Sequence, residues 1–209
     1  MNFFKDIQQY SGQPLSHQLL MSLLTEYKRP NDKINELIAN GSLTSIKKGL
    51  YFSSLTKVPE RFLVANHIVG PSYVSFESAL SFYGFIPEQV YEVSSATIKS
   101  SRRFDTSLGR FTYQHLGLPY YSLGITNETL GEGQTVLMAR PEKAVFDKIV
   151  TTSGVILRSV ISAATYVIED LRMDESLLKE LDTDMMEHWL ALSPKKDSLA
   201  TMIKMIKEL

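Results

Sequence analysis

The chain of 209 residues contains no cysteine. This absence excludes disulfide bonds, thiolate metal sites and cysteine nucleophiles, and it fits a reducing cytoplasm. No apolar run approaches the roughly 18 residues needed to cross a bilayer, and the first residues lack the apolar stretch and cleavage site of a secretory signal. We therefore expect a cytoplasmic protein that does not enter a membrane.

The chain also lacks an excess of charge of either sign, since 22 basic and 23 acidic residues give a formal net charge of -1. A strongly basic protein would be drawn to nucleic acid by its overall field, whereas here any charge argument has to be local. Hydrophobic residues make up 44% of the chain, which is enough for a globular protein with a core.

The first 58 residues show three helix-like segments followed by two short strand-like ones. Apolar residues at helical spacing predict helices over residues 1–10 and 14–27 and a third helix that ends near Asn40. Two strands then flank a turn at Lys48-Gly49. This is the order of elements in a winged helix-turn-helix domain, in which the third helix enters the major groove of DNA and the hairpin approaches the phosphates.

Basic side chains gather in this N-terminal part, which has a formal charge of +3 although the whole chain has -1. Lysines at the tip of a wing would each neutralise a phosphate and release counterions, which positions a protein on DNA without reading its sequence. The residues predicted to hold phosphates are Lys28, Arg29, Lys33, Lys47 and Lys48.

Base recognition is assigned to the outer face of the third helix. Asn31 and Asn35 are four residues apart and hence on one face, and asparagine can bond adenine at two points. Asp32 and Glu36 lie in the same helix and would repel phosphate. The pattern also has a simpler interpretation, because lysine beside glycine is common in solvated turns and protects strand edges.

Residues 59–209 are predicted to form a second, larger domain. Residues 90–138 are rich in Val, Thr, Tyr and Phe with turn residues between them, which predicts several antiparallel strands. From Pro141 onward the pattern is helical. The expected fold class is α+β, with a winged helix-turn-helix at 1–58 and a mixed α/β domain that ends in helices.

Three stretches of the chain look familiar in combination. The first is INELIANGSLTSIKKGLYF at 34–52, with a helix, a glycine, a basic strand and a Gly-Leu-Tyr in that order. The others are YVSFESALSFYGFIPE at 73–88 and ARPEKAVFDKI at 139–149. In this order they resemble the AbiEi family, the antitoxins of type IV toxin–antitoxin systems and their transcriptional-regulator relatives. No motif beyond residue 150 matches that family.

The resemblance implies two activities. The N-terminal domain would bind inverted repeats in the double-stranded operator DNA of its own promoter and repress the operon. The C-terminal domain would counter a toxin with a nucleotidyltransferase-like fold, without a requirement for direct binding to it. We expect no cofactor and no bound metal. The main alternative is a winged-helix module for protein interaction, without sequence-specific DNA binding.

Little in the sequence indicates catalysis, and we expect that the protein is not an enzyme. Gly41-Ser42 and the pair Asp182 and Asp184 superficially resemble pieces of a nucleotidyltransferase, where aspartates hold metal, but they are far apart in the chain. The four histidines have no metal-ligand spacing, and there is no Gly-x-Ser-x-Gly sequence of a serine hydrolase.

A second basic cluster lies in the region predicted to form strands, with only Asp105 among its members to offset its charge. Its members are Lys99, Arg102, Arg103 and Arg110. One interpretation is a solvated hairpin whose charges guard a strand edge. The other is a second nucleic-acid contact, to extended operator DNA or to an RNA.

Overall fold

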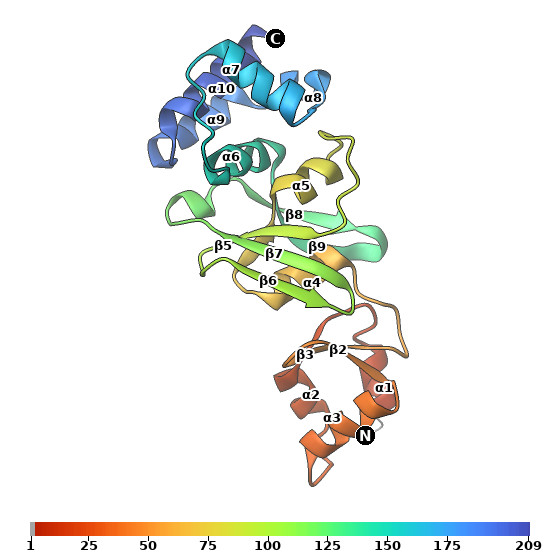
Figure 1. The fold of residues 1–209 in the computed structure, drawn as a ribbon. Coiled ribbons are helices and arrows are strands. Elements are labelled where there is room, and N and C mark those ends of the chain that lie inside the picture. Colours follow the sequence, from red (N-terminus) through yellow and green to blue (C-terminus); the bar gives the residue numbers. More distant parts are fainter. Residues whose placement is uncertain (1–2) are drawn as a thin grey trace.

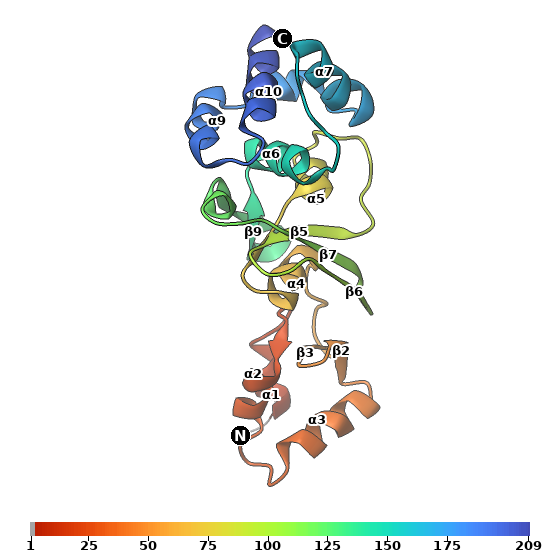
Figure 2. The same cartoon turned by 60° about the vertical axis from the view of Figure 1, so that its left-hand side comes forward.

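The structure, a computed structural model, describes residues 3–209, so residues 1 and 2 of the predicted first helix and first domain lie outside the described residues. Figures 1 and 2 show an elongated molecule with three levels. A small N-terminal module occupies one end, a six-stranded sheet the middle, and a group of helices the other end.

The N-terminal module combines three helices with a three-stranded antiparallel sheet in the order β1-β3-β2. Its elements are α1 (Phe3–Gln8), β1 (Leu15–Ser16), α2 (His17–Leu23), α3 (Pro30–Ala39), β2 (Leu43–Lys47) and β3 (Leu50–Ser53). The predicted order of helices and hairpin is confirmed. The helix predicted over 14–27 is shorter, because the Ser16 hydroxyl caps α2 by accepting a hydrogen bond from the Leu19 amide at 3.1 Å.

The turn between β2 and β3 is where the sequence placed it. Gly49 has a φ of +83°, a conformation that an L side chain rarely adopts, so glycine suits this position. Alternation along β3 then directs Leu50 and Phe52 to one face of the small sheet and Tyr51 to the other. The small sheet thus lies between two hydrophobic clusters.

The middle level is a mixed sheet in the order β6-β7-β5-β4-β9-β8. Its strands are β4 (Ser72–Val74), β5 (Val93–Thr97), β6 (Arg102–Thr106), β7 (Gly109–His115), β8 (Ile125–Leu130) and β9 (Gln134–Ala139). Two pairs, β4–β9 and β5–β7, are parallel. The prediction of antiparallel strands over residues 90–138 was therefore wrong for β5 with β7, whereas it is confirmed for β6–β7 and β8–β9. The reason is that the β6–β7 hairpin docks on β5 through its second strand, which leaves β6 at the sheet edge.

Helices cover both faces of this sheet. In Figures 1 and 2, α4 (Arg61–Ile68) lies on the face toward the N-terminal module, and α5 (Phe76–Phe82) and α6 (Pro141–Thr151) lie on the opposite face. The far end consists of α7 (Val160–Ala164), η3 (Thr165–Asp170), α8 (Glu175–Lys179), α9 (Thr183–Trp189) and α10 (Lys196–Glu208). Among residues 3–209, no helix combines the length and the apolar character needed to span a bilayer.

Hydrophobic packing is continuous across the predicted boundary at residue 58. The larger cluster runs through the six-stranded sheet to the last helices and also includes Ile46, Leu50 and Phe52 of the hairpin. The smaller cluster is confined to the N-terminal module and contains Leu20, Ile34 and other side chains of α1, α2 and α3. The hairpin is therefore hydrogen-bonded within the N-terminal sheet, while one of its faces packs against the larger hydrophobic core.

Candidate nucleic-acid interface

The third helix has one buried and one exposed face. Pro30 occupies its first turn, where its missing amide hydrogen costs nothing. Ile34 and Leu37 are 3% and 0% exposed and fix the helix to the small core. Asn31 and Asn35, both exposed, lie on the opposite side as their spacing predicts. Asn35 makes no side-chain hydrogen bond within the described part of the chain, so its amide is free to bind a ligand.

The two acidic residues of α3 are engaged by neighbouring cations. The Asp32 carboxylate lies 3.7 Å from the Arg29 guanidinium, and the Glu36 carboxylate lies 2.6 Å from the Lys33 ammonium. The hydrogen bond to Glu36 raises the pKa of Lys33 above its usual value. Exposed pairs of this kind are weak, so phosphate can replace the carboxylates. As long as no phosphate is bound, the carboxylates of Asp32 and Glu36 offset the positive charges of Arg29 and Lys33.

His17 joins three elements of the N-terminal module. Its Nε2 lies 2.8 Å from Oδ1 of Asn31, and its backbone amide donates to the Gly49 carbonyl at 2.9 Å. The start of α2, the start of α3 and the wing turn therefore meet at one point. Sequence reasoning missed this residue, because a lone histidine without metal-ligand spacing gives no signal of a hydrogen bond to a residue 14 positions away.

The lysines of the wing turn have different surroundings. Lys48 is exposed, whereas Lys47 is half-buried with its ammonium 5.6 Å from the centre of the Phe104 ring. Burial lowers the pKa of Lys47, and the positive charges of Lys99 and Arg102 lower it further. Lys28, before α3, is also exposed. In residues 3–209 no carboxylate pairs with Lys28, Lys47 or Lys48.

The second basic cluster divides into two parts. Asp105 lies 2.8 Å from the Arg110 guanidinium and 3.9 Å from that of Arg103, so these two arginines share one carboxylate. The hydrogen bond from Arg110 also lowers the pKa of Asp105. Lys99 and Arg102 have no ion pair among the described residues. In the cluster that looked uniform in the sequence, two arginines therefore pair with a carboxylate and the other two cations do not.

Two contacts fix the N-terminal module on the rest of the chain. The Ser107 hydroxyl, at the tip of the β6–β7 hairpin, donates to the Ser45 carbonyl at 3.2 Å. Gly12, with a φ of +71°, passes so close to Gln134 that a Cβ would lie 2.8 Å from its Nε2. The wing is thus supported by the six-stranded sheet rather than projecting freely into solvent.

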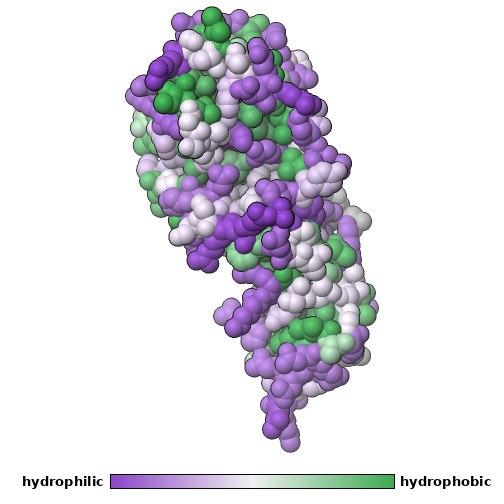
Figure 3. All heavy atoms as spheres, in the orientation of Figure 1, coloured by the Kyte–Doolittle hydropathy of each residue, from purple (hydrophilic) through white to green (hydrophobic). Residues whose placement is uncertain are grey.

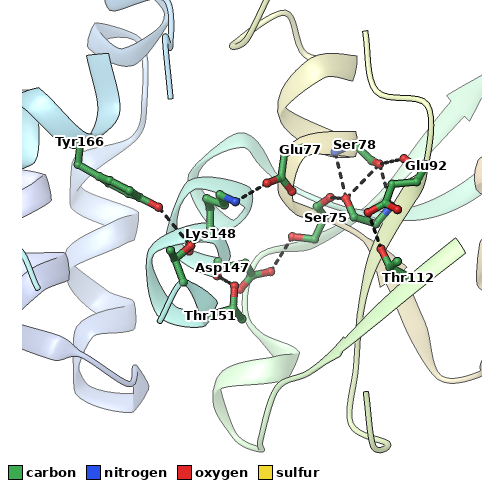
Figure 4. Close-up of polar contacts among 11 residues, drawn as sticks. Ser75, Glu77, Ser78, Glu92, Thr112, Asp147, Lys148, Thr151 and Tyr166 are labelled. Atoms are coloured by element: carbon green, nitrogen blue, oxygen red, sulfur yellow. Dashed lines mark hydrogen bonds and ion pairs between the residues drawn. The ribbon is translucent and has the colours of Figure 1, made fainter. Parts of the chain in front are cut away.

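A buried polar network lies at the junction of β4, α6 and the loop before β8. Asp147, which is fully buried, accepts from the Ser75 hydroxyl at 2.7 Å and from the Tyr73 hydroxyl at 2.9 Å. Its other oxygen accepts from Tyr120 at 2.9 Å and from the Lys143 ammonium at 2.5 Å. Figure 4 shows Ser75 and Asp147 pointing toward each other from two elements. Four donors therefore satisfy one buried carboxylate.

This network joins two of the stretches that resemble the AbiEi family, since Ser75 belongs to 73–88 and Asp147 to 139–149. Figure 4 shows a second link beside it, an ion pair between Lys148 and Glu77. Burial lowers the pKa of Lys143, whose ammonium lies 3.3 Å from the centre of the Tyr120 ring. Lys143 is fully buried too, so a substrate could reach this pair only by displacing the surrounding tyrosines.

The residues that resembled pieces of a nucleotidyltransferase have local structural roles. The Asp182 carboxylate caps α9 by accepting from the Met185 amide at 2.9 Å. Gly41 and Ser42 connect α3 to β2 in the N-terminal module, at the other end of the molecule. Within residues 3–209, no three His, Asp or Glu side chains are grouped so that they could hold a metal ion.

Comparison with known proteins identifies the fold but not the family. No family model matches this sequence, and no curated protein matches it. The fold is similar to the crystal structure of the RV2827C protein from Mycobacterium tuberculosis, with a TM-score of 0.60, 13% sequence identity and coverage of 97% of this chain and 75% of that one. An identity this low concerns the fold alone. The α+β architecture is confirmed, and membership of the AbiEi family stays a prediction.

Proposed function

We propose that this chain is a sequence-specific DNA-binding repressor that acts as the antitoxin of a type IV, AbiE-like toxin–antitoxin system. It would bind inverted repeats in the operator DNA upstream of its own gene and oppose a nucleotidyltransferase-like toxin. The role requires no turnover, cofactor or metal. Asn31 and Asn35 would contact bases, and Lys28, Arg29, Lys33, Lys47 and Lys48 would hold phosphates.

The observation that carries this proposal is the meeting of α3 and the wing turn at His17. Winged domains place the recognition helix in the major groove and the wing beside neighbouring phosphates. Here the contacts of His17 with Asn31 and Gly49 hold these two parts together, with the exposed amide of Asn35 on the same helix face as Asn31. Lys48, which precedes Gly49 in the wing turn, is exposed and would bind a phosphate of the DNA backbone.

The antitoxin part of the proposal is supported by the stretches of resemblance. Two of them pack together through the hydrogen bond of Ser75 to Asp147, so they form one structural unit rather than unrelated matches. This unit lies in the part of the chain that the family resemblance assigns to toxin control.

The experiment that tests repression is a reporter fused to the DNA upstream of this gene. Expression of the protein in trans should lower reporter output, and scrambling the inverted repeats should abolish the effect. An unchanged output with intact repeats would contradict the repressor role. Co-expression with the product of an adjacent nucleotidyltransferase-like gene tests the antitoxin role separately, through recovery of growth.

A second candidate function is a module for protein interaction without sequence-specific DNA binding. The packing of Ile46, Leu50 and Phe52 on the larger core favours it, because a hairpin that is built into a core can be a structural support rather than a DNA-binding wing. Binding to operator DNA that is weak and insensitive to salt would favour this alternative.

A further inference from the structure

The surface where the wing meets the six-stranded sheet carries cations that no carboxylate neutralises. Lys47 ends β2 and Lys48 follows it in the wing turn, whereas Lys99 lies in the connection between β5 and β6 and Arg102 is the first residue of the edge strand β6. None of the four has an ion pair among the residues that the structure describes. In Figures 1 and 2 the β6–β7 hairpin extends toward β2 and β3, and the positive charges of Lys99 and Arg102 act on Lys47.

Two contacts define how these cations are placed. The Lys47 ammonium lies 5.6 Å from the centre of the Phe104 ring, and the Ser107 hydroxyl donates a hydrogen bond to the Ser45 carbonyl at 3.2 Å. The end of β2 that leads into the wing turn therefore lies against the β6–β7 hairpin. Figure 3 shows hydrophilic side chains over this region, where the N-terminal module joins the middle of the molecule.

Strand alternation sorts the basic residues of β6 by face. Residues two apart point to the same side of a strand, so Arg102 shares a side with Phe104, the ring beneath Lys47. Arg103 points to the other side together with Asp105, which pairs with it. Arg102, which has no ion pair among the described residues, is thus on the side of the wing, and Arg103, which pairs with Asp105, is on the opposite side.

The arrangement is electrostatically unfavourable unless an anion is bound. Burial lowers the pKa of Lys47, and the positive charges of Lys99 and Arg102 lower it further because like charges repel. Protein surfaces usually intersperse charges of both signs, as Asp105 does on the opposite side. A bound polyanion such as the phosphate backbone of DNA would relieve this repulsion.

We infer that Lys47, Lys48, Lys99 and Arg102 form a single phosphate-binding strip, here named the junction strip, which extends the DNA contact from the wing onto the edge of the six-stranded sheet. This inference rests on the proposed function and adds to it the path of the DNA backbone. The ligand is double-stranded DNA, because the strip begins at the wing turn that adjoins α3. Arg103 and Arg110 are outside it.

The test compares two double variants that remove the same number of charges from one hairpin. Lys99→Ala with Arg102→Ala removes the part of the strip that lies outside the wing, whereas Arg103→Ala with Arg110→Ala removes the two arginines that share the Asp105 carboxylate. For each full-length variant, the affinity for the upstream DNA is measured as salt is varied, and the protected DNA is mapped by hydroxyl-radical footprinting. Thermal unfolding verifies that both variants fold as the parent does.

The first variant should show a slope of log affinity against log salt that is shallower by about 1.8, since each phosphate contact contributes about 0.9. Its footprint should be shorter at one end, while the control variant keeps the parent's slope and footprint. Equal slopes for both variants, or loss in the control alone, would overturn the junction strip but leave the proposed function intact. The junction strip would also be overturned if the first variant lost affinity for an RNA duplex but kept the parent's affinity for DNA. If the parent protein binds neither upstream nor scrambled DNA, both proposals fail.

Discussion

The ammonium of Lys47 lies 5.6 Å from the centre of the Phe104 ring, a contact that connects the wing turn to the edge strand of the large sheet. Because Lys47 is half-buried and its ammonium is attracted to this ring, the wing is held against the rest of the chain. The hydrogen bond of Ser107 to Ser45 acts in the same direction. A preorganised wing loses less conformational freedom when it binds DNA than a free arm would.

Replacement of Lys47 and Lys48 by alanine should weaken binding to every DNA sequence, because phosphate contacts carry no sequence information. The slope of log affinity against log salt should become shallower by up to about 1.8, the contribution of two phosphates. Salt-varied anisotropy titrations measure this change. The matched control is Lys196→Ala with Lys204→Ala, which removes two exposed charges from α10 at the other end of the molecule. An unchanged slope in the wing variant, or an equal change in the control, would show that the wing tip does not touch DNA.

Replacement of Asn35 by alanine should reduce affinity for the operator and leave affinity for scrambled DNA unchanged. A bidentate contact to a base is worth about 1–3 kcal/mol, so the ratio of the two affinities should fall by roughly 5- to 150-fold. Competition titrations with both DNAs measure this ratio. Asn127→Ala serves as control, since Asn127 is exposed on β8 in the other sheet. If both DNAs lose affinity equally, Asn35 does not read bases.

Replacement of Asp147 by asparagine should destabilise the fold strongly. Lys143 would be left as a buried cation without a counter-charge, and removal of one partner from a buried pair costs about 3–5 kcal/mol. Urea unfolding measures the loss. Asp105→Asn, which breaks the exposed pair with Arg110, should change the unfolding midpoint little. A midpoint for Asp147→Asn close to that of the parent would mean that the network contributes no net stability.

Stability should fall when pH rises above about 10, the ordinary pKa of tyrosine. Burial raises the pKa of five of the ten tyrosines, most strongly for Tyr73 and Tyr120, and raises that of Tyr121 to about 12. Above pH 10 the unfolded chain therefore binds fewer protons than the folded one, which favours unfolding. Lys47, Lys143 and Lys195 act in the opposite sense, because burial lowers their pKa values in the fold, but they are three groups against five.

Urea unfolding at several alkaline pH values, with tyrosinate absorbance followed in parallel, measures this effect. The buried tyrosines should ionise only as the chain unfolds, so absorbance and loss of structure should coincide for them. Stability that is constant or rises through this pH range would contradict the assignment of these side chains to a sealed core.

The sequence predicted the N-terminal module well because its signals are local. The buried face of α3, the first-turn proline and Gly49 in the turn each follow from neighbouring residues. The parallel pairing of β5 with β7 could not be predicted, since it depends on which strand of a hairpin docks. The division of the second basic cluster also required the structure, because Asp105 could have paired with any of its neighbours. The same holds for His17 and for the donors around Asp147, which come from distant parts of the chain.

Sequence-specific binding to the operator is the central claim, and a titration tests it most directly. The protein is titrated into DNA from upstream of its own gene and into scrambled DNA of equal length, with salt varied for both. We predict tight binding to the upstream DNA that weakens steeply with salt, and much weaker binding to the scrambled DNA. Equal affinity for both would contradict sequence recognition, and no binding to either would contradict a DNA-binding function altogether.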